Sequence, residues 1–526
     1  MPPGKLIPNY VTASIALSFG GLLNGYESGC IGSIAHMEQF SADIGPMSST
    51  VVGITVSMIL LTGIAPALFA GRLADKSGRL RIMMPGAALF GIGALLQATS
   101  FSLGQFIFGR AVTGFGQGVF LPNIAVYISE IAPSRRRGRL TSLPQFMATL
   151  GICVGYFTGY TTSFIESSAA WRLPYVIQIL LSAMLAAACR SLPESPRWLI
   201  LQGRAQEAMT ALRLLDFDMD EARRDFLDTP QEQPSLSNRQ TLLLPFRGPY
   251  RYRTILSLFF LSMIQLSGID AIVYVRLPDP YNVEQDLLLN ELQQYAPALF
   301  EQAGISHSSS SLVASGVSSI AMFLISIPAF ILADKWGRRT SAIGGGLCLS
   351  GLMALIGSLY AADIVSTVGA VRWVVIVSVV LFGMTYCATW NIVAKIYASE
   401  IQPGNTRAAG NSISMASSFF CNWLVALITP ILLGASAYGA YYLFGGLTIF
   451  TSIVLALFMP ETRGRSLENI QSEFRRPVLG VFRHLRIPGG PRAPADQGQA
   501  GQEDDPVELA ARTQETAAAS SSGIAA

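Results

Sequence analysis

The sequence predicts an all-α membrane protein of twelve transmembrane helices in two six-helix bundles, with further helices in a cytoplasmic linker. Three observations support this prediction. The 526 residues are 13% charged and 51% hydrophobic, whereas a soluble protein carries about a quarter charged residues. The apolar runs are about 20 residues long, which is the length of a helix that crosses a bilayer. The two halves of the chain repeat each other.

The repeat is clearest in two charged motifs. Residues 73–79 read LADKSGR and residues 332–338 read LADKWGR. A second pair, YISEIAP at 127–133 and YASEIQP at 397–403, recurs at a similar offset of roughly 260 residues, far longer than a solenoid repeat. Each motif follows a long apolar run, so we expect each to be a short loop between two helices at the membrane surface.

Twelve apolar spans follow from windows of about 20 residues. They lie near residues 10–32, 50–70, 82–100, 104–128, 140–162, 172–190, 254–275, 311–332, 342–361, 371–398, 408–433 and 439–459. Arg and Lys concentrate in the loops after the second, fourth, sixth and eighth spans, and the loops after the first, third and fifth carry almost none. The positive-inside rule therefore predicts that both termini are cytoplasmic.

The sequence divides into four parts on this basis. We predict an N-terminal bundle at 1–192, a cytoplasmic linker at 193–253, a C-terminal bundle at 254–470 and a tail at 471–526. The linker contains an amphipathic stretch at 206–226. The tail is rich in Pro, Gly, Ala, Gln and Ser, a composition typical of disorder.

Composition also limits the function. No spacing of nucleophile and base or of metal ligands occurs, so we expect no enzyme, no metal and no cofactor. The net charge of +3 says little about partners, and we expect none among nucleic acids. Buried free thiols are the expected state of the cysteines, which all fall in apolar segments. These are Cys30, Cys153, Cys189, Cys348, Cys387 and Cys421.

Four motifs occur together in order along the chain. They are GRLADKSGR at 71–79, GRAVTGFGQG at 109–118, PESPRWL at 193–199 and PETRGRSLE at 460–468. Together they resemble the sugar porter family of the major facilitator superfamily, in particular its fungal-type sugar/proton symporters. The resemblance covers nearly the whole chain outside the tail. It implies the major facilitator fold, with the substrate held near the membrane midplane between two bundles that rock against each other.

The resemblance implies a function as well. We expect transport of a monosaccharide, polyol or sugar acid by alternating access, coupled to proton uptake, in a multi-pass protein of the plasma membrane, with the vacuolar membrane as an alternative. Three other functions remain open: a uniporter, a carrier of another small metabolite such as quinate, and a nutrient sensor that does not transport. The expected partners are the small-molecule substrate, the proton and the lipid bilayer.

The charges of the repeated motifs suggest a cytoplasmic latch. Carboxylates and arginines would pair when the two halves close on the inner side and part when they open. Each exposed pair contributes only about 0–1 kcal/mol, and the alternative is that the charges set only topology and solubility. The predicted latch residues are Arg72, Asp75, Arg79, Glu130, Arg137, Glu194, Arg197, Asp334, Arg338, Glu400, Arg407 and Glu461.

Ionisable residues within the predicted spans need a reason, because a charge at the bilayer centre costs about 2.5–3.5 kcal/mol on insertion scales. By the resemblance, Glu27 occupies the position where proton symporters carry an aspartate and facilitators usually an asparagine. Arg110 is its counterpart in the fourth span. A carboxylate beside an arginine can lose a proton on one side and regain it on the other, so we predict proton coupling. A purely structural pair is the alternative.

The resemblance also assigns part of the substrate pocket. Gln145, Gln265 and Asn422 match positions whose amides hydrogen-bond sugar hydroxyls. Ile264 and Met322 stand where the family usually carries a glutamine and an asparagine.

Charged residues replace two further pocket positions. Asp270 stands in place of an asparagine and Lys395 in place of a stacking tryptophan, while Trp390 remains nearby as a possible stacking surface. Asp270 and Lys395 can neutralise each other. Otherwise Lys395 can receive a carboxylate, which would favour a sugar acid or a quinate-like substrate.

An insertion interrupts the seventh span. Residues 265–274 begin a family motif that continues, after 20 residues, as YAPALF at 295–300. The intervening segment, 275–294, contains charged residues that cannot lie in lipid. It is either an outer loop at the break of a discontinuous helix or an in-frame intron retained in the coding sequence, since its removal rejoins Tyr274 to Tyr295 and restores the motif.

Overall fold

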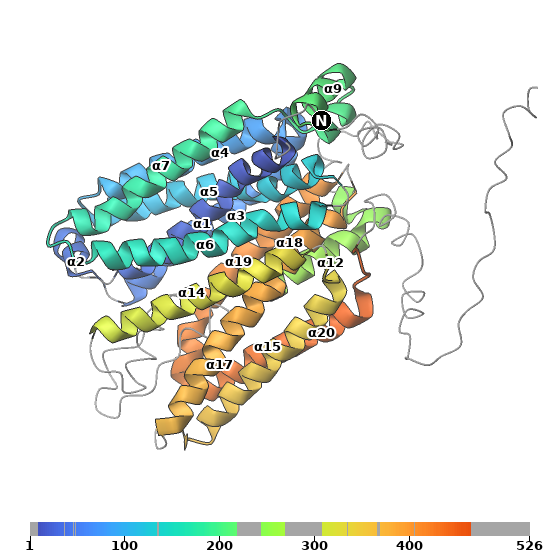
Figure 1. Cartoon of the computed structure of the whole chain (residues 1–526). Helices are drawn as coiled ribbons and strands as arrows, with labels where there is room; N and C mark the ends of the chain where they lie inside the picture. Colours follow the sequence, from blue (N-terminus) through green and yellow to red (C-terminus); the bar gives the residue numbers. More distant parts are fainter. Residues whose placement is uncertain are drawn as a thin grey trace, which may run out of the picture. The chain divides into compact units, whose positions relative to one another are not determined.

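The computed structural model of the chain is built from helices (Figure 1). It describes residues 9–35, 37–45, 47, 49–133, 136–217, 244–268, 308–333, 335–364, 369–403 and 406–463. The predicted tail, the insertion at 275–294, Asp270 and Asp334 lie outside the described residues.

Six long helical segments lie in each half of the described chain, as predicted. In the first half they are α1 (Asn9–Ala35), α3 (Ser49–Ser77), α4 (Arg79–Ala98), α5 (Leu103–Ile131), α6 (Arg137–Thr162) and α7 (Ala169–Ser191). In the second half they are α12 (Gly248–Gln265), α14 (Ser308–Leu332), α15 (Arg338–Ala361), α17 (Gly369–Ala388) with α18 (Trp390–Glu400), α19 (Arg407–Ala435) and α20 (Ala437–Phe458).

Shorter helices connect these segments. They are α2 (Glu38–Ile44), α8 (Pro196–Leu201), α9 (Ala205–Leu214) and the 3-10 turn η2 (Leu244–Phe246). The start of α1 meets the segment that follows α9: the backbone N–H of Tyr10 donates to the carbonyl oxygen of Leu215 at 3.2 Å. The chain thus returns after six long helices to the end where the first one begins, as an even number of spans requires.

The prediction that the motif at 73–79 is a loop was wrong. Helix α3 continues to Ser77 and α4 begins at Arg79, so a single residue, Gly78, separates them. Gly78 has φ 109°, and a Cβ atom there would lie 2.6 Å from Oε1 of Glu194. Only glycine combines a positive φ with this close approach, and it allows two helices to turn sharply within one residue.

Two further spans differ from the prediction. The tenth is broken at Thr389 (φ −121°, ψ −82°), which divides it into α17 and α18. The seventh helix, α12, ends at Gln265 rather than near residue 275. The hydrophobicity on both sides of each break is high, so apolar runs alone gave no sign of either.

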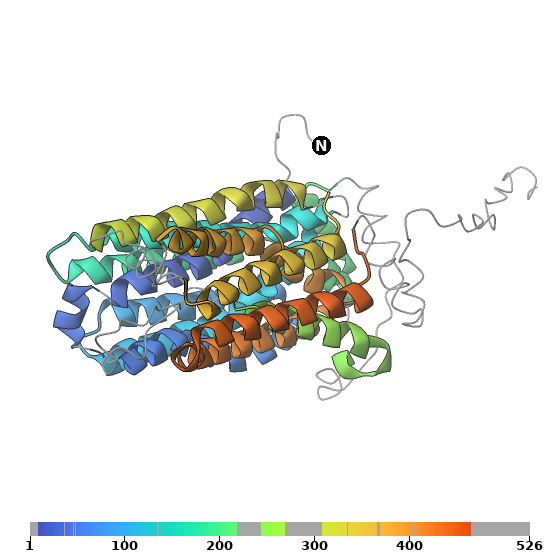
Figure 2. The ribbon, with the colours of Figure 1, turned by 90° about the horizontal axis from the view of Figure 1, so that it is seen from below.

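The two halves pack through a few helix pairs. Helix α3 contacts α19, and α6 contacts α14, along which it runs side by side in both views (Figures 1 and 2). Within the first half, α5 packs closely on its neighbours. A Cβ atom at Gly114 would lie 2.3 Å from the carbonyl oxygen of Ile59, and one at Gly118 would lie 2.3 Å from that of Gly63. The small residues of α5 therefore permit close helix approach.

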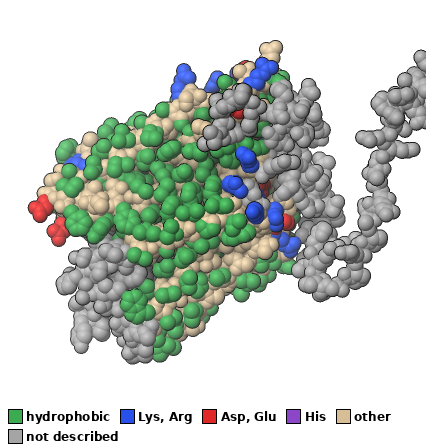
Figure 3. Space-filling view, viewed as in Figure 1, with side chains coloured by type: hydrophobic (Ala, Val, Ile, Leu, Met, Phe, Trp, Pro, Cys, Tyr) green, Lys and Arg blue, Asp and Glu red, His purple; other side chains and the backbone are tan. Residues whose placement is uncertain are grey.

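The outer surface suits a bilayer. Hydrophobic side chains cover the flank of the helices, and Lys and Arg gather at one end, called the charged end below (Figure 3). Large apolar side chains such as Phe108, Leu180 and Val377 are more than half exposed. Nine helical segments of the described ranges are long and apolar enough to cross a membrane, and a shorter apolar helix covers Gly316–Leu332.

The cysteines fit their prediction only in part. Cys30, Cys189, Cys387 and Cys421 are buried free thiols, as expected. Cys153 is partly exposed and Cys348 is exposed, because each lies on a helix face that turns away from the core.

Candidate functional site

Glycines of α1 place the site residues of the first half. Gly21, Gly25 and Gly29 recur every four residues and therefore share one face of the helix. A Cβ atom on Gly25 would lie 1.9 Å from the carbonyl oxygen of Ala148 in α6. The two backbones thus run in direct contact, which fixes the position of Gln145 on α6 relative to α1.

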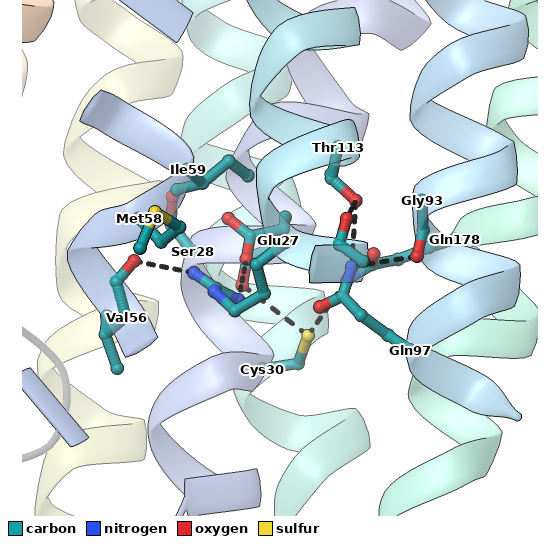
Figure 4. Close-up of polar contacts among 12 residues, drawn as sticks. Glu27, Ser28, Cys30, Val56, Met58, Ile59, Gly93, Gln97, Thr113 and Gln178 are labelled. Atoms are coloured by element: carbon teal, nitrogen blue, oxygen red, sulfur yellow. Dashed lines mark hydrogen bonds and ion pairs between the residues drawn. The ribbon is translucent and has the colours of Figure 1, made fainter. Parts of the chain in front are cut away.

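Glu27 and Arg110 form the ion pair that the sequence predicts. The guanidinium Nη1 of Arg110 donates to Oε1 of Glu27 at 2.7 Å, and Nη2 donates to the carbonyl oxygen of Val56 at 2.7 Å. Glu27 is 4% exposed and Arg110 is 1% exposed. Figure 4 shows this network around Glu27 and Val56. A buried charge pair of this kind is stable only while both partners remain ionised.

A cavity of about 220 Å³ lies beside this pair, between the two halves. Both members of the pair contribute to its lining. Six amide side chains also line it: Asn24, Gln117 and Gln145 from the first half, and Gln265, Asn391 and Asn422 from the second half. Amides present both a donor and an acceptor, so a ring of them suits a ligand with many hydroxyl groups.

The structure brings together Gln145, Gln265 and Asn422, which the sequence placed in the pocket. Ile264 and Met322 line the cavity as well. The amide of Gln265 donates to the hydroxyl of Ser418 at 3.1 Å.

Sequence reasoning missed three lining amides, Asn24, Gln117 and Asn391. A helical-period argument could have found them. Asn24 precedes Glu27 by three residues, Gln117 follows Arg110 by seven, and Asn391 precedes Lys395 by four. These spacings return to the same helix face.

Lys395 lines the cavity from α18, six residues after the break at Thr389 in the chain. Its ammonium Nζ donates a short hydrogen bond to Oε1 of Gln145 in α6, across the two halves of the chain. Asp270, the predicted alternative partner of Lys395, lies outside the described residues.

Trp390 does not reach the cavity, which corrects its prediction as a stacking surface. It is fully buried, and its indole N–H donates to the carbonyl oxygen of Ala342 at 2.7 Å. Its ring packs edge-on against Phe260, with centroids 6.1 Å apart. As the first residue of α18, Trp390 faces α15 rather than the cavity that Lys395 reaches.

At the charged end, Arg79 is the centre of a buried cluster. Its guanidinium contacts Oδ1 of Asp75 at 2.6 Å and Oε1 of Glu130 at 3.1 Å. Glu194 accepts hydrogen bonds from the backbone N–H groups of Arg79, Leu80 and Arg81. This carboxylate therefore caps the positive N-terminus of α4. Burial raises the pKa of Glu194, although its backbone hydrogen bonds oppose that rise.

The second half repeats this cluster. Arg338 contacts Glu400 at 3.2 Å, and Glu461 accepts from the backbone N–H groups of Arg338 and Arg339 at 2.8 and 3.1 Å. Glu461 thus caps α15 as Glu194 caps α4. Asp334, the expected counterpart of Asp75, lies outside the described residues.

The ion pairs described above for Arg79 and Arg338 join residues of the same half. They lie within each half because Asp75 and Glu130 face Arg79 from helices of one bundle. Arg407 of α19 lies close enough for its charge to attract Asp75 and Glu130, which belong to the other half. Pairing of charges across the two halves stays a prediction.

Contacts to backbone carbonyl oxygens also join the halves there. The amide of Asn411 donates to the carbonyl oxygen of Pro122 at 2.7 Å, and Arg139 donates to that of Ile331 at 3.2 Å. A Cβ atom on Gly71 would lie 2.1 Å from the carbonyl oxygen of Ala408. Contacts to backbone carbonyl oxygens therefore help to close the charged end.

The remaining predicted latch residues lie at the same end. Arg72 is on α3, Arg137 is the buried first residue of α6 and Arg197 is on α8. Sequence reasoning missed Trp198, whose indole N–H donates to the carbonyl oxygen of Asp75 at 2.8 Å. This bond satisfies a carbonyl in the last turn of α3 and holds α8 against the cluster.

Gly25 gives a testable prediction for the glycine contact. We expect Gly25→Ala to reduce the free energy of unfolding by about 1–3 kcal/mol or more, because the added methyl group meets backbone that cannot move aside. Gly351→Ala is the matched control, since nothing lies within 4 Å of a Cβ atom there. Thermal unfolding of the two purified variants would measure the difference. Equal midpoints would contradict the close contact of α1 and α6.

Comparisons with known proteins agree with this arrangement. The model of the sugar (and other) transporter family matches residues 13–276 and 285–474. The glucose transporter GlcP of Staphylococcus epidermidis is 32% identical over 463 residues, which cover 87% of this chain and 96% of that protein. The sugar transporter STL1 of Saccharomyces cerevisiae is 28% identical over 90% of this chain and 82% of its own length.

A solved structure supports the fold. The proton:xylose symporter XylE, bound to 6-bromo-6-deoxy-D-glucose, matches with a TM-score of 0.73 at 20% identity, over 88% of this chain and 99% of that chain. The likeness shows the twelve-helix major facilitator fold. The family match covers most of the chain, and the curated relatives match over most of their length. The chain therefore belongs to the sugar (and other) transporter family and is a multi-pass membrane transporter rather than an enzyme.

Proposed function

We propose that the protein carries a monosaccharide, polyol or sugar acid across a membrane by alternating access, together with a proton. One observation carries this proposal: the buried Glu27–Arg110 pair adjoins a cavity that amides from both halves line. A ligand bound there touches both halves at once, so its binding can favour one arrangement of the halves over another.

The coupling step follows from the position of Glu27. When the cavity opens to one side, the carboxylate can exchange a proton with that side. Protonation removes the charge that holds Arg110, and the pair must then rearrange, because a buried guanidinium without its carboxylate is unfavourable. Proton release and sugar release are linked in this way. The relation to XylE, a proton:xylose symporter, supports this proposal.

We further propose that the charged end faces the cytoplasm of a cell whose plasma membrane holds the protein. The concentration of Lys and Arg at that end supports this orientation under the positive-inside rule. The clusters around Arg79 and Arg338 would act as part of the latch by keeping each half rigid. Arg407 and the contacts between Gly71 and Ala408 would separate when the end opens.

Uptake into proteoliposomes tests the function. Labelled hexoses, polyols and hexuronates are added outside, with an imposed proton gradient and with a protonophore as control. A gradient of about one pH unit, or ~1.4 kcal/mol, supports about tenfold accumulation at one proton per sugar. We expect accumulation that the protonophore abolishes. Equilibration that ignores the protonophore would indicate a uniporter, and binding without any flux would indicate a sensor.

The insertion gives a second prediction, made from the sequence. The family match leaves residues 277–284 unmatched, within the segment 275–294. We expect a chain that lacks 275–294 to show at least the transport activity of the intact chain, because removal restores the continuous motif of the seventh span. The same uptake assay on both forms checks this, and activity confined to the intact form would show that the segment is a genuine outer loop.

A further inference from the structure

The charges that line the cavity do not balance. The charged residues among its lining are Glu27, Arg110 and Lys395. Glu27 and Arg110 neutralise each other at 2.7 Å. Lys395 therefore leaves the described lining with one excess positive charge.

The partner of Lys395 is a neutral group. Within the part of the chain that the structure describes, its ammonium donates to the amide oxygen of Gln145, and no carboxylate lies within ion-pair distance. An ammonium group taken out of water is costly unless an anion compensates it, and an amide dipole compensates only in part. The cavity thus contains a cation whose natural counter-ion is missing from its walls.

We propose that the substrate supplies this counter-ion and is a small polyhydroxylated carboxylate. Its carboxylate would accept hydrogen bonds from Lys395 Nζ, and its hydroxyl groups would bond the amides of Gln265, Asn391 and Asn422. This inference rests on the proposed function and names the substrate class of that site. It replaces the alternative that Asp270 neutralises Lys395, which predicts a neutral substrate.

The size of the cavity agrees with such a ligand. Its volume of about 220 Å³ is below the range of about 300–1,000 Å³ that is usual for drug-sized ligands. The lining is also polar on both halves, because amides from α1, α5, α6, α12, α18 and α19 contribute to it. A single hydroxylated ring or short chain with one carboxylate matches both properties.

Binding of a carboxylate has a consequence for the contact between the halves. The bond from Lys395 to Gln145 joins α18 to α6. The same two residues also line a smaller cavity of about 40 Å³, together with Asn411 of the contact at the charged end. An anion that draws the ammonium away from Gln145 removes one bond between the halves at the boundary of the two cavities. Substrate recognition would thereby weaken the closed arrangement on that side.

Matched pairs of ligands test the inference. D-glucose and D-glucuronate, D-galactose and D-galacturonate, and D-sorbitol and D-gluconate differ within each pair only in a CH₂OH group that becomes a carboxylate. Calorimetry at pH 7 on the full chain in nanodiscs gives the ratio of the two affinities within each pair. We expect at least one acid to bind about ten- to a hundredfold more tightly than its neutral partner, as a charge-assisted hydrogen bond permits.

Variants of Lys395 show whether this side chain causes the preference for the acid. Lys395→Gln should bring that ratio down to about one or reverse it, and Lys395→Arg should retain a preference for the acid. Met322→Leu, at an uncharged position of the same cavity, should leave the ratio unchanged. Because the readout is a ratio within one folded protein, a general loss of affinity does not imitate the result.

Two outcomes would overturn the inference. One is that no acid binds more tightly than its neutral partner. The other is that the preference for the acid survives in Lys395→Gln. Flux is measured separately in proteoliposomes, so binding with the expected ratio but without transport would contradict the proposed function and leave the inference standing. Transport of neutral sugars alone would support the proposed function and contradict the inference.

Discussion

Replacement of Glu27 by glutamine is expected to abolish accumulation of substrate while exchange of substrate across the membrane continues. Glutamine keeps the length of the side chain and an oxygen that can accept from Arg110. It cannot bind and release a proton, so a proton gradient no longer drives transport. In proteoliposomes, we expect the internal concentration of labelled substrate to rise only to the external one, whereas the wild type accumulates about tenfold per pH unit.

Exchange against unlabelled substrate separates loss of coupling from loss of the fold. Glu27→Gln should retain this exchange, although the buried Arg110 loses its counter-ion and the variant should be less stable, with a cost of up to about 3–5 kcal/mol. Glu27→Asp, which keeps the carboxylate, should recover accumulation at least in part. Undiminished, protonophore-sensitive accumulation by Glu27→Gln would show that the pair is purely structural.

The fold was largely predictable because its strongest signals are local. Apolar runs and basic loops gave the long helices, and the repeat of LADKSGR as LADKWGR gave the two halves. The helix ends were less predictable. Helix α3 continues through the charged residues to Ser77, since a helix can extend past the membrane surface, and only the positive φ of Gly78 ends it. Hydropathy does not report such a backbone constraint.

The site was predictable where residues pair over short, obligatory contacts. A carboxylate and an arginine in apolar spans need each other, so Glu27 and Arg110 could be paired from sequence. The prediction that Trp390 contacts the substrate was wrong because the break at Thr389 sets which face of α18 points to the cavity. That orientation depends on packing against α15. The bond between Lys395 and Gln145 could not be predicted from the sequence either, because it joins residues 250 positions apart in the two halves.

Substitutions at the charged end are expected to have two different effects, one on stability and one on the equilibrium between the closed and open forms. Arg79→Met should destabilise the protein by about 3–5 kcal/mol, because it leaves Asp75 and Glu130 buried without their cation. Adding Glu130→Gln to that variant should recover part of the loss, since it removes one of the stranded charges. Thermal unfolding of the single and double variants forms a double-mutant cycle that measures this coupling. Simple additivity of the two changes would contradict the cluster.

Arg407→Met should act on the equilibrium between closed and open forms instead. Arg407 attracts Asp75 and Glu130 from the other half, so its loss favours separation of the halves at the charged end. A cysteine placed at Ala408, which packs against Gly71 in the closed end, would report this in a background without other cysteines. We expect its labelling to accelerate about fivefold, which is the effect of ~1 kcal/mol, while Arg79→Met changes it less. If both variants lowered stability alike and left labelling unchanged, the charges would serve the rigidity of the end, and the latch would consist of the uncharged contacts between α3, α5 and α19.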